Sequence, residues 1–166
     1  MNKKVFIING SGGVGKDTFV EFVQKYSNTE NVSSVGEVKA FASLMGWNGE
    51  KDEKSRKFLS DLKDILTEYN DRPFKFMERE VNLFLADKHT EFLFLHIREP
   101  EEIQRAKEAF NATTILVTRD SVEQVKGNHA DERVLQYTYD IYIKNDGSLN
   151  ILDAVARKFV SDNRYQ

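Results

Sequence analysis

Short apolar runs recur along the chain, and each has about the length of one buried strand. The run "KKVFIIN" at residues 3–9 is rich in β-branched and aromatic residues, and "EFLFLHI" at residues 91–97 is strongly apolar. Continuous apolar runs are typical of strands that are covered on both faces, as in a parallel sheet. We therefore expect strands over residues 3–9, 91–97, 113–118 and 139–145, and a shorter one over residues 31–37.

The segments between these runs carry the periodicity of amphipathic helices. Pro73 suits the first turn of one such helix, which runs to about residue 88. Acidic residues open another, at residues 99–110, where the helix dipole favours them. The clearest stripe, at the i, i+3, i+4 and i+7 spacing within residues 17–26, consists of Phe19, Phe22, Val23 and Tyr26. Further helices are expected over residues 38–46, 55–69 and 149–160.

The alternation of strands with helices predicts an α/β fold with a parallel sheet. The 166 residues suit one compact domain, and neither an internal repeat nor a linker interrupts them. We therefore expect a single domain over residues 1–166. The polar segment 119–133, between the last two strands, is a candidate flap, although a plain surface loop has the same composition.

Composition restricts the partners. The net charge of -3 makes a large basic surface improbable, so we expect no nucleic-acid partner. The chain has no cysteine, which excludes disulfides and thiol catalysis. Its first residues resemble neither a signal peptide nor a membrane-spanning helix, so we expect a cytoplasmic protein without a membrane partner.

The stretch "NGSGGVGKDT", residues 9–18, carries the clearest chemical signal. Gly10 and Gly15 have the spacing of a phosphate-binding loop, and Lys16 follows directly. The stretch also follows a predicted strand and opens a predicted helix, as such a loop requires. Glycines let backbone amides turn toward an anion, and the helix N-terminus adds its positive end. The pattern therefore predicts that amides from Gly12 to Lys16 bind nucleotide phosphates.

Two other interpretations fit the same glycines. Gly10, Gly12 and Gly15 also match the dinucleotide-binding fingerprint, with Glu37 as the acid that would bind a ribose. Against it, that fingerprint has no use for a lysine after its last glycine, and the chain lacks room for a separate substrate domain. A glycine turn without any ligand is the remaining interpretation.

Asp17 stands where a phosphate-binding loop usually has Ser or Thr, and Thr18 comes one place later. A carboxylate is a hard oxygen ligand, so Asp17 is a candidate magnesium ligand while Thr18 contacts the nucleotide. Alternatively, Asp17 satisfies free amides at the start of the helix. The two roles are compatible.

The "GKDT" of this loop resembles the deoxynucleoside monophosphate kinases of phage and bacterial type, and it is similar to animal-type phosphomevalonate kinases. Further short segments match in the same order along most of the chain. The resemblance implies a P-loop NTPase fold, a three-layer sandwich around a central five-stranded parallel sheet. It also implies a helical acceptor-binding insert over about 37–88 and a lid over about 119–134.

The resemblance assigns basic residues to the acceptor. It implies that Lys39, Arg56 and Arg98 bind the acceptor phosphate, and that Arg119 is a lid arginine. Arg56 lies in the charged stretch "EKSRK", so solvated surface is an alternative for it. The family has an aspartate where this chain has His96, a poor magnesium ligand that is expected to pack or hydrogen-bond.

The donor side is implied in the same way. Lys16, Arg98 and Arg119 are the expected catalytic residues: Lys16 and Arg119 would balance the charge of the transferred phosphoryl group, and Arg98 would bind the acceptor phosphate. The segment "YDIYIKNDGSL" resembles the turn that borders the nucleotide base. The nucleotide-binding residues are thus expected to be Gly12, Gly13, Val14, Gly15, Lys16, Asp17, Thr18, Asn145 and Gly147.

These observations lead us to expect ATP-dependent phosphoryl transfer, with Mg²⁺, to a small phosphorylated acceptor. A (deoxy)nucleoside monophosphate is the first expected acceptor, and a non-nucleotide phosphate of the phosphomevalonate type is the alternative. A nucleoside triphosphatase or nucleotide-binding protein without an acceptor is a further alternative. A nucleoside triphosphatase would need an acidic residue at position 96, where this chain has histidine. The sequence does not indicate an oligomeric state.

Overall fold

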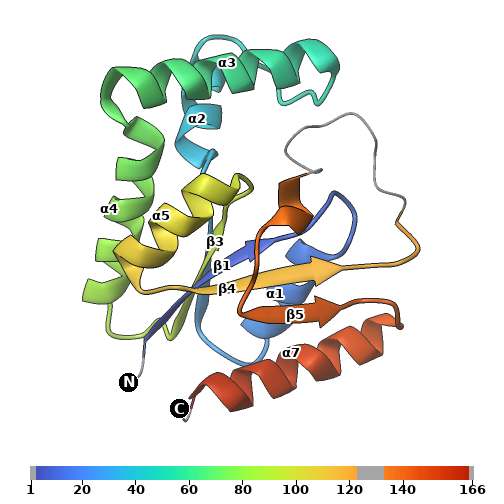
Figure 1. The fold of residues 1–166 in the computed structure, drawn as a ribbon. Helices are drawn as coiled ribbons and strands as arrows, with labels where there is room; N and C mark the ends of the chain where they lie inside the picture. The colour runs from blue at the N-terminus through green and yellow to red at the C-terminus, as the bar shows by residue number, and fades with distance from the viewer. Residues whose placement is uncertain (1–2, 123–132, 165–166) are drawn as a thin grey trace.

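Five parallel strands form one sheet in the order β2-β3-β1-β4-β5 (Figure 1). The structure is a computed structural model, and it describes residues 3–122 and 133–164. The sheet confirms the predicted α/β fold. Its strands are β1 (Lys4–Asn9), β2 (Thr29–Ser33), β3 (Phe92–His96), β4 (Thr113–Thr118) and β5 (Ile141–Lys144).

Helices cover both faces of the sheet, as expected for a three-layer sandwich. The helices are α1 (Lys16–Gln24), α2 (Gly36–Leu44), α3 (Glu53–Asn70), α4 (Arg72–Ala86), α5 (Pro100–Phe110) and α7 (Leu149–Arg164), with a short 3₁₀ helix η1 (Val134–Gln136). Figure 1 shows α3 lying across the top of the molecule, α2 below it, and α4 running down from α3 beside the sheet. These three helices form the chain between β2 and β3.

Alternate residues of β1 build the two halves of the core. Phe6 and Ile8 pack with buried side chains of α1 and α7, whereas Val5 and Ile7 pack with those of α4 and α5. In the first half, the Phe6 ring lies 5.2 Å from that of Phe94 between centroids. Because both faces of the sheet are buried, its strands need continuous apolar runs. These runs made the strands recognisable in the sequence.

The second strand differs from its prediction. It was expected over residues 31–37, but β2 runs over Thr29–Ser33 and α2 already begins at Gly36. Pairing with β3 sets these bounds, because Thr29 lies opposite Phe92 and Ser33 lies opposite His96. The boundary was therefore wrong because register with a distant strand determined it.

Local signals explain how α3 begins and how the chain turns into α4. The Asp52 side chain accepts a hydrogen bond of 2.8 Å from the amide of Ser55, so α3 begins earlier than the predicted residue 55. Asp71 adopts a left-handed conformation between the two helices, and its carboxylate pairs with Arg105. Pro73 occupies the first turn of α4, as predicted. In the described part of the chain, no helix combines the length and apolar character needed to cross a membrane.

Candidate functional site

The glycine stretch forms the turn that joins β1 to α1. Gly10, Gly13 and Gly15 have φ values of 144°, 81° and 94°. The helix begins at Lys16, and the amide of Phe19 donates to the Gly15 carbonyl at 2.9 Å. The strand, turn and helix therefore have the arrangement that the sequence predicted. The amides in the first turn of α1 point out of the helix end, where they suit a bound anion.

Asn145 holds the middle of this loop from the other end of the chain. Its side-chain amide donates to the Val14 carbonyl at 2.9 Å, and its own backbone amide donates to Thr118 at 2.8 Å. Asn145 is only 7% exposed, and a Cβ on Gly15 would overlap its Nδ2 atom. The side chain thus braces the loop. A contact between the nucleotide base and the Asn145–Gly147 turn stays a prediction.

Lys16 lies over the loop from its first helical position. Its ammonium group donates to the carbonyls of Gly10 and Ser11, the latter at 3.0 Å. A lysine that reaches back in this way places its charge against the first residues of the glycine loop. This is where the terminal phosphates of a nucleotide would need a cation.

Asp17 faces His96 across the start of the helix. Its Oδ1 lies 3.7 Å from Nδ1 of His96, and the side chains are 82% and 18% exposed, respectively. Burial lowers the pKa of His96, an effect that Asp17 opposes and that Lys16 and Arg98 reinforce. The His96 Nε2 is buried and has no hydrogen-bond partner within the described residues. The residue at the end of β3 is thus a largely buried neutral imidazole beside an exposed carboxylate.

The strand order brings the two expected catalytic arginines to the loop. In register, Ile8 of β1 lies opposite His96, two residues before Arg98. On the other side, Asn9 lies opposite Leu116, three residues before Arg119. Arg98 and Arg119 therefore follow the strands that flank β1, at the carboxyl edge of the sheet where ligands of open α/β folds gather.

Arg98 and Arg119 differ from most other arginines of the chain in that their side chains form no ion pair with a described residue. Neither Arg98 nor Arg119, nor Arg56 in the first turn of α3, has a hydrogen bond or ion pair from its side chain to another described residue. All three are exposed, as is Lys39 on α2. By contrast, acidic partners hold Arg72, Arg79, Arg105, Arg133 and Arg164. The arginines that the resemblance assigned to phosphate are thus not neutralised by described carboxylates.

The acid required by the dinucleotide interpretation is engaged elsewhere. Arg72 donates to both carboxylate oxygens of Glu37 at 2.8 Å. Arg79 approaches the same carboxylate at 3.7 Å. Glu37 therefore anchors α2 to α4 and does not offer its carboxylate to a ribose, which removes the main support for that interpretation.

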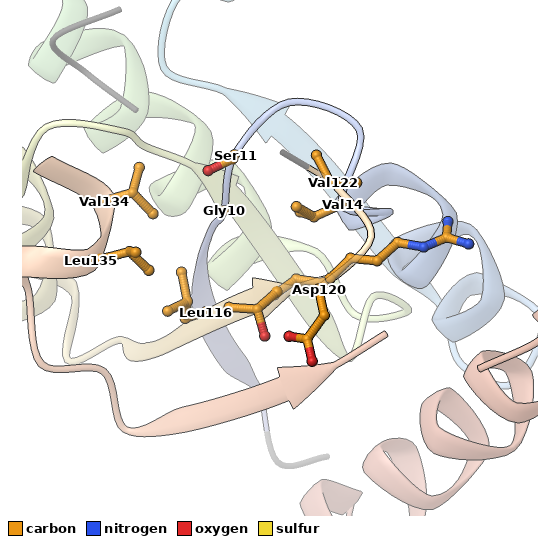
Figure 2. Close-up of a pocket in the computed structure, with 11 residues that line it drawn as sticks. Gly10, Ser11, Val14, Leu116, Asp120, Val122, Val134 and Leu135 are labelled. Carbon is orange, nitrogen blue, oxygen red and sulfur yellow. The ribbon is translucent and has the colours of Figure 1, made fainter. Parts of the chain in front are cut away.

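A hollow of about 360 Å³ adjoins the first residues of the loop. The end of β4 and Arg119, which follows it, line this hollow, and Val134 and Leu135 of η1 form one wall. Figure 2 shows Val14 and Val122 opposite that wall, with Gly10 and Ser11 between them. The lid expected over 119–134 adjoins this hollow, but its residues 123–132 lie outside the described residues.

Two buried polar residues at the loop were missed by the sequence analysis. Asn9, the last residue of β1, is 1% exposed, and Tyr139, just before β5, is 4% exposed. The Asn9 Nδ2 donates to the Tyr139 hydroxyl at 2.9 Å and to the Arg98 carbonyl at 3.1 Å. An asparagine that ends an apolar run directly before the first glycine was the signal available for Asn9.

Comparison with known proteins supports the fold alone. No family model matches the chain, and no curated protein matches it. Among solved structures, TT1252 from Thermus thermophilus has a TM-score of 0.58 and 15% identity, covering 98% of each chain. A "putative kinase" from Chloroflexus aurantiacus j-10-fl has a TM-score of 0.55 and 10% identity, covering 98% of this chain and 99% of its own.

These similarities agree with the geometry. The five parallel strands, the helices on both faces and the glycine loop between β1 and α1 form one consistent architecture. The more specific resemblance, to deoxynucleoside monophosphate kinases, stays a prediction. The chain shares the α/β fold of these solved structures, with a central five-stranded parallel sheet.

Proposed function

We propose that the chain transfers a phosphoryl group from ATP to a small phosphorylated acceptor, and that this acceptor is a (deoxy)nucleoside monophosphate. The observation that carries the proposal is the glycine loop with Lys16 lying between two exposed arginines, Arg98 and Arg119, that no described carboxylate neutralises. Phosphoryl transfer depends on positioning and on neutralising charge, and this arrangement supplies cations on both sides of one loop.

The donor would lie on the loop. Amides from Gly12 to Lys16 bind its phosphates, and Thr18 adds a hydroxyl from the first turn of α1. Lys16 and Arg119 balance the charge on the group in transfer. The turn at Asn145 and Gly147 borders the base. Residues 119–134 would form the lid over this nucleotide.

The acceptor would lie on the other side of the transferred group. Arg98 follows the buried strand β3 and its carbonyl accepts a hydrogen bond from Asn9, so its backbone is anchored beside the loop. Its guanidinium can bind a phosphate through two hydrogen bonds. Lys39 and Arg56 reach the same phosphate from the helical insert, residues 37–88. The insert and the sheet then belong to one kinase domain over residues 1–166.

Asp17 is the residue that fits Mg²⁺. Magnesium is usually bound through one or two carboxylates together with phosphate oxygens and water. The exposed carboxylate of Asp17 at the start of α1 meets this requirement, whereas His96 does not offer a hard oxygen ligand. No cluster of three or more potential metal-binding side chains occurs among residues 3–122 and 133–164, so phosphates would complete the coordination. When bound, the ion would neutralise charge on the donor phosphates.

The test is ADP release with ATP and a panel of deoxy- and ribonucleoside monophosphates, with phosphomevalonate as the non-nucleotide member. A monophosphate is expected to accelerate ADP release strongly over the rate with ATP alone. If no phosphorylated small molecule does so, the kinase proposal is wrong, and a nucleotide-binding protein without an acceptor takes its place.

The variant Arg98→Met tests whether Arg98 belongs to the acceptor site. Loss of a charged hydrogen bond costs about 1.5–3 kcal/mol, which is roughly a 10- to 150-fold loss in acceptor use. ATP affinity is expected to stay near that of the parent chain. Arg157→Met is the matched control, because Arg157 is also an exposed arginine without a described ion pair but lies on α7. If Arg98→Met weakens ATP binding as much as acceptor use, Arg98 belongs to the donor site.

A further inference from the structure

A buried chain of hydrogen bonds connects four segments around the glycine loop. Asn9 accepts from the Gly10 amide through Oδ1 at 2.8 Å. Its Nδ2 donates to the Arg98 carbonyl and to the Tyr139 hydroxyl. The Tyr139 hydroxyl in turn donates to the Val134 carbonyl at 2.9 Å. The chain thus joins the loop, Arg98 two residues after β3, the helix η1, and Tyr139 two residues before β5.

The protons in this chain have one consistent arrangement. Both hydrogens of the Asn9 amide are used, and the single hydroxyl proton of Tyr139 goes to Val134. Burial raises the pKa of Tyr139 to about 12, so the hydroxyl keeps the proton that it donates. A network in which every donor is used holds its members at defined distances, since any shift leaves a buried polar group unpaired.

Packing of the core does not by itself require polar side chains at Asn9 and Tyr139. An apolar pair of similar shape can replace a buried hydrogen-bonded pair at little cost in stability. The ring of Tyr139 already packs edge-on against those of Tyr137 and Tyr142. The polar atoms instead meet three backbone groups that border the proposed site: the first loop amide, the carbonyl of the acceptor arginine and a wall of the hollow.

We propose that Asn9 and Tyr139 are positioning residues that hold Arg98 and η1 in register with the first amide of the glycine loop. This inference rests on the proposed function, because the register matters for aligning an acceptor phosphate with the donor. Both residues act through backbone groups. Tyr139 acts on Arg98 indirectly, by fixing the Asn9 amide that binds the Arg98 carbonyl.

Two variants test the hydrogen bonds of Tyr139 and those of Asn9 separately. Tyr139→Phe keeps the ring and removes only the hydroxyl. It is expected to raise the acceptor KM about 2- to 10-fold, the range of one neutral hydrogen bond, with ATP affinity unchanged. Asn9→Asp keeps an oxygen for the Gly10 amide but loses both donors. It is expected to have the larger effect on acceptor KM, and because its carboxylate lies beside the first amide of the glycine loop it is also expected to weaken ATP binding, so Tyr139→Phe is the variant that tests acceptor use separately from ATP affinity.

A double variant distinguishes positioning from simple stabilisation. If Tyr139 acts through Arg98, Tyr139→Phe adds little to the acceptor KM of Arg98→Met. Independent, multiplying effects would overturn the inference, as would a lowered melting temperature with an unchanged acceptor KM. Tyr142→Phe is the control, because the Tyr142 hydroxyl accepts from the Tyr139 amide and makes no hydrogen bond to Asn9 or Arg98 among the described residues.

Hydrogen–deuterium exchange tests the same inference without an acceptor. In Tyr139→Phe, amides in peptides that cover Gly10 and Arg98 are expected to exchange faster, whereas peptides from α7 keep the parent rate. Unchanged exchange at Arg98 would overturn the positioning role even if the chain is a kinase. Conversely, a parent chain that no monophosphate stimulates but whose exchange responds as expected would retain the network and reject the proposed function.

Discussion

Gly15→Ala tests how the glycine loop is held. Gly15 has a φ of 94°, and a Cβ there would overlap the Nδ2 of Asn145. The left-handed conformation costs an alanine about 1–2 kcal/mol. Displacing Asn145 also breaks its 2.9 Å hydrogen bond to Val14 and leaves a buried amide unpaired, at about 1–3 kcal/mol. The sum is a loss of about 2–5 kcal/mol in the free energy of unfolding.

Two neighbouring glycines separate these costs. Gly13 has a φ of 81°, but an alanine methyl group there would have no atom within 4 Å, so Gly13→Ala is expected to lose only about 1–2 kcal/mol. Gly12 has neither a positive φ nor a near neighbour, so Gly12→Ala is expected to change stability by less than about 0.5 kcal/mol. Urea unfolding followed by circular dichroism measures all three.

Asn145→Ala completes the test. In the double variant Gly15→Ala with Asn145→Ala, the overlap disappears, so the combined loss is expected to be smaller than the sum of the two single losses. If Gly15→Ala is no more destabilising than Gly13→Ala, or if the two losses simply add, then Asn145 does not brace the loop in the way described.

The remaining predictions concern charge at the site. Lys16→Ala is expected to abolish most phosphoryl transfer while leaving the urea midpoint near that of the parent; normal turnover in a folded variant would contradict the phosphate-loop assignment. Asp17→Ala is expected to raise the magnesium concentration for half-maximal rate, and Asp17→Ser to recover part of the loss, whereas an unchanged requirement in both would leave only the capping role. Because burial lowers the pKa of His96 from 6.5, the unfolded chain binds a proton there more readily than the folded chain, so stability decreases as the pH falls through and below about 6.5. His96→Asn is expected to weaken that decrease, as measured by urea unfolding at pH 7 and pH 5 in EDTA; equal changes in both chains would refute it.

Local features of the chain carried the information for the fold and the loop. A strand buried on both faces needs a continuous apolar run, and a phosphate-binding loop needs its glycines and lysine within a few adjacent residues. The residues 9–18 contain that whole motif, and their neighbours β1 and α1 form as predicted. The cap at Asp52 and the proline in the first turn of α4 are local in the same sense.

Tertiary structure alone decided which distant groups meet. Asn145 reaches Val14 across 131 positions, and Asn9 reaches Tyr139 across 130, because β1, β4 and β5 lie side by side in the sheet. The bounds of β2 depended on its register with β3. Likewise, the sequence does not show which arginines form ion pairs, and only the folded chain shows that Asp71 neutralises Arg105. Periodicity reports which face of an element is buried, whereas register and side-chain reach determine which atoms come into contact.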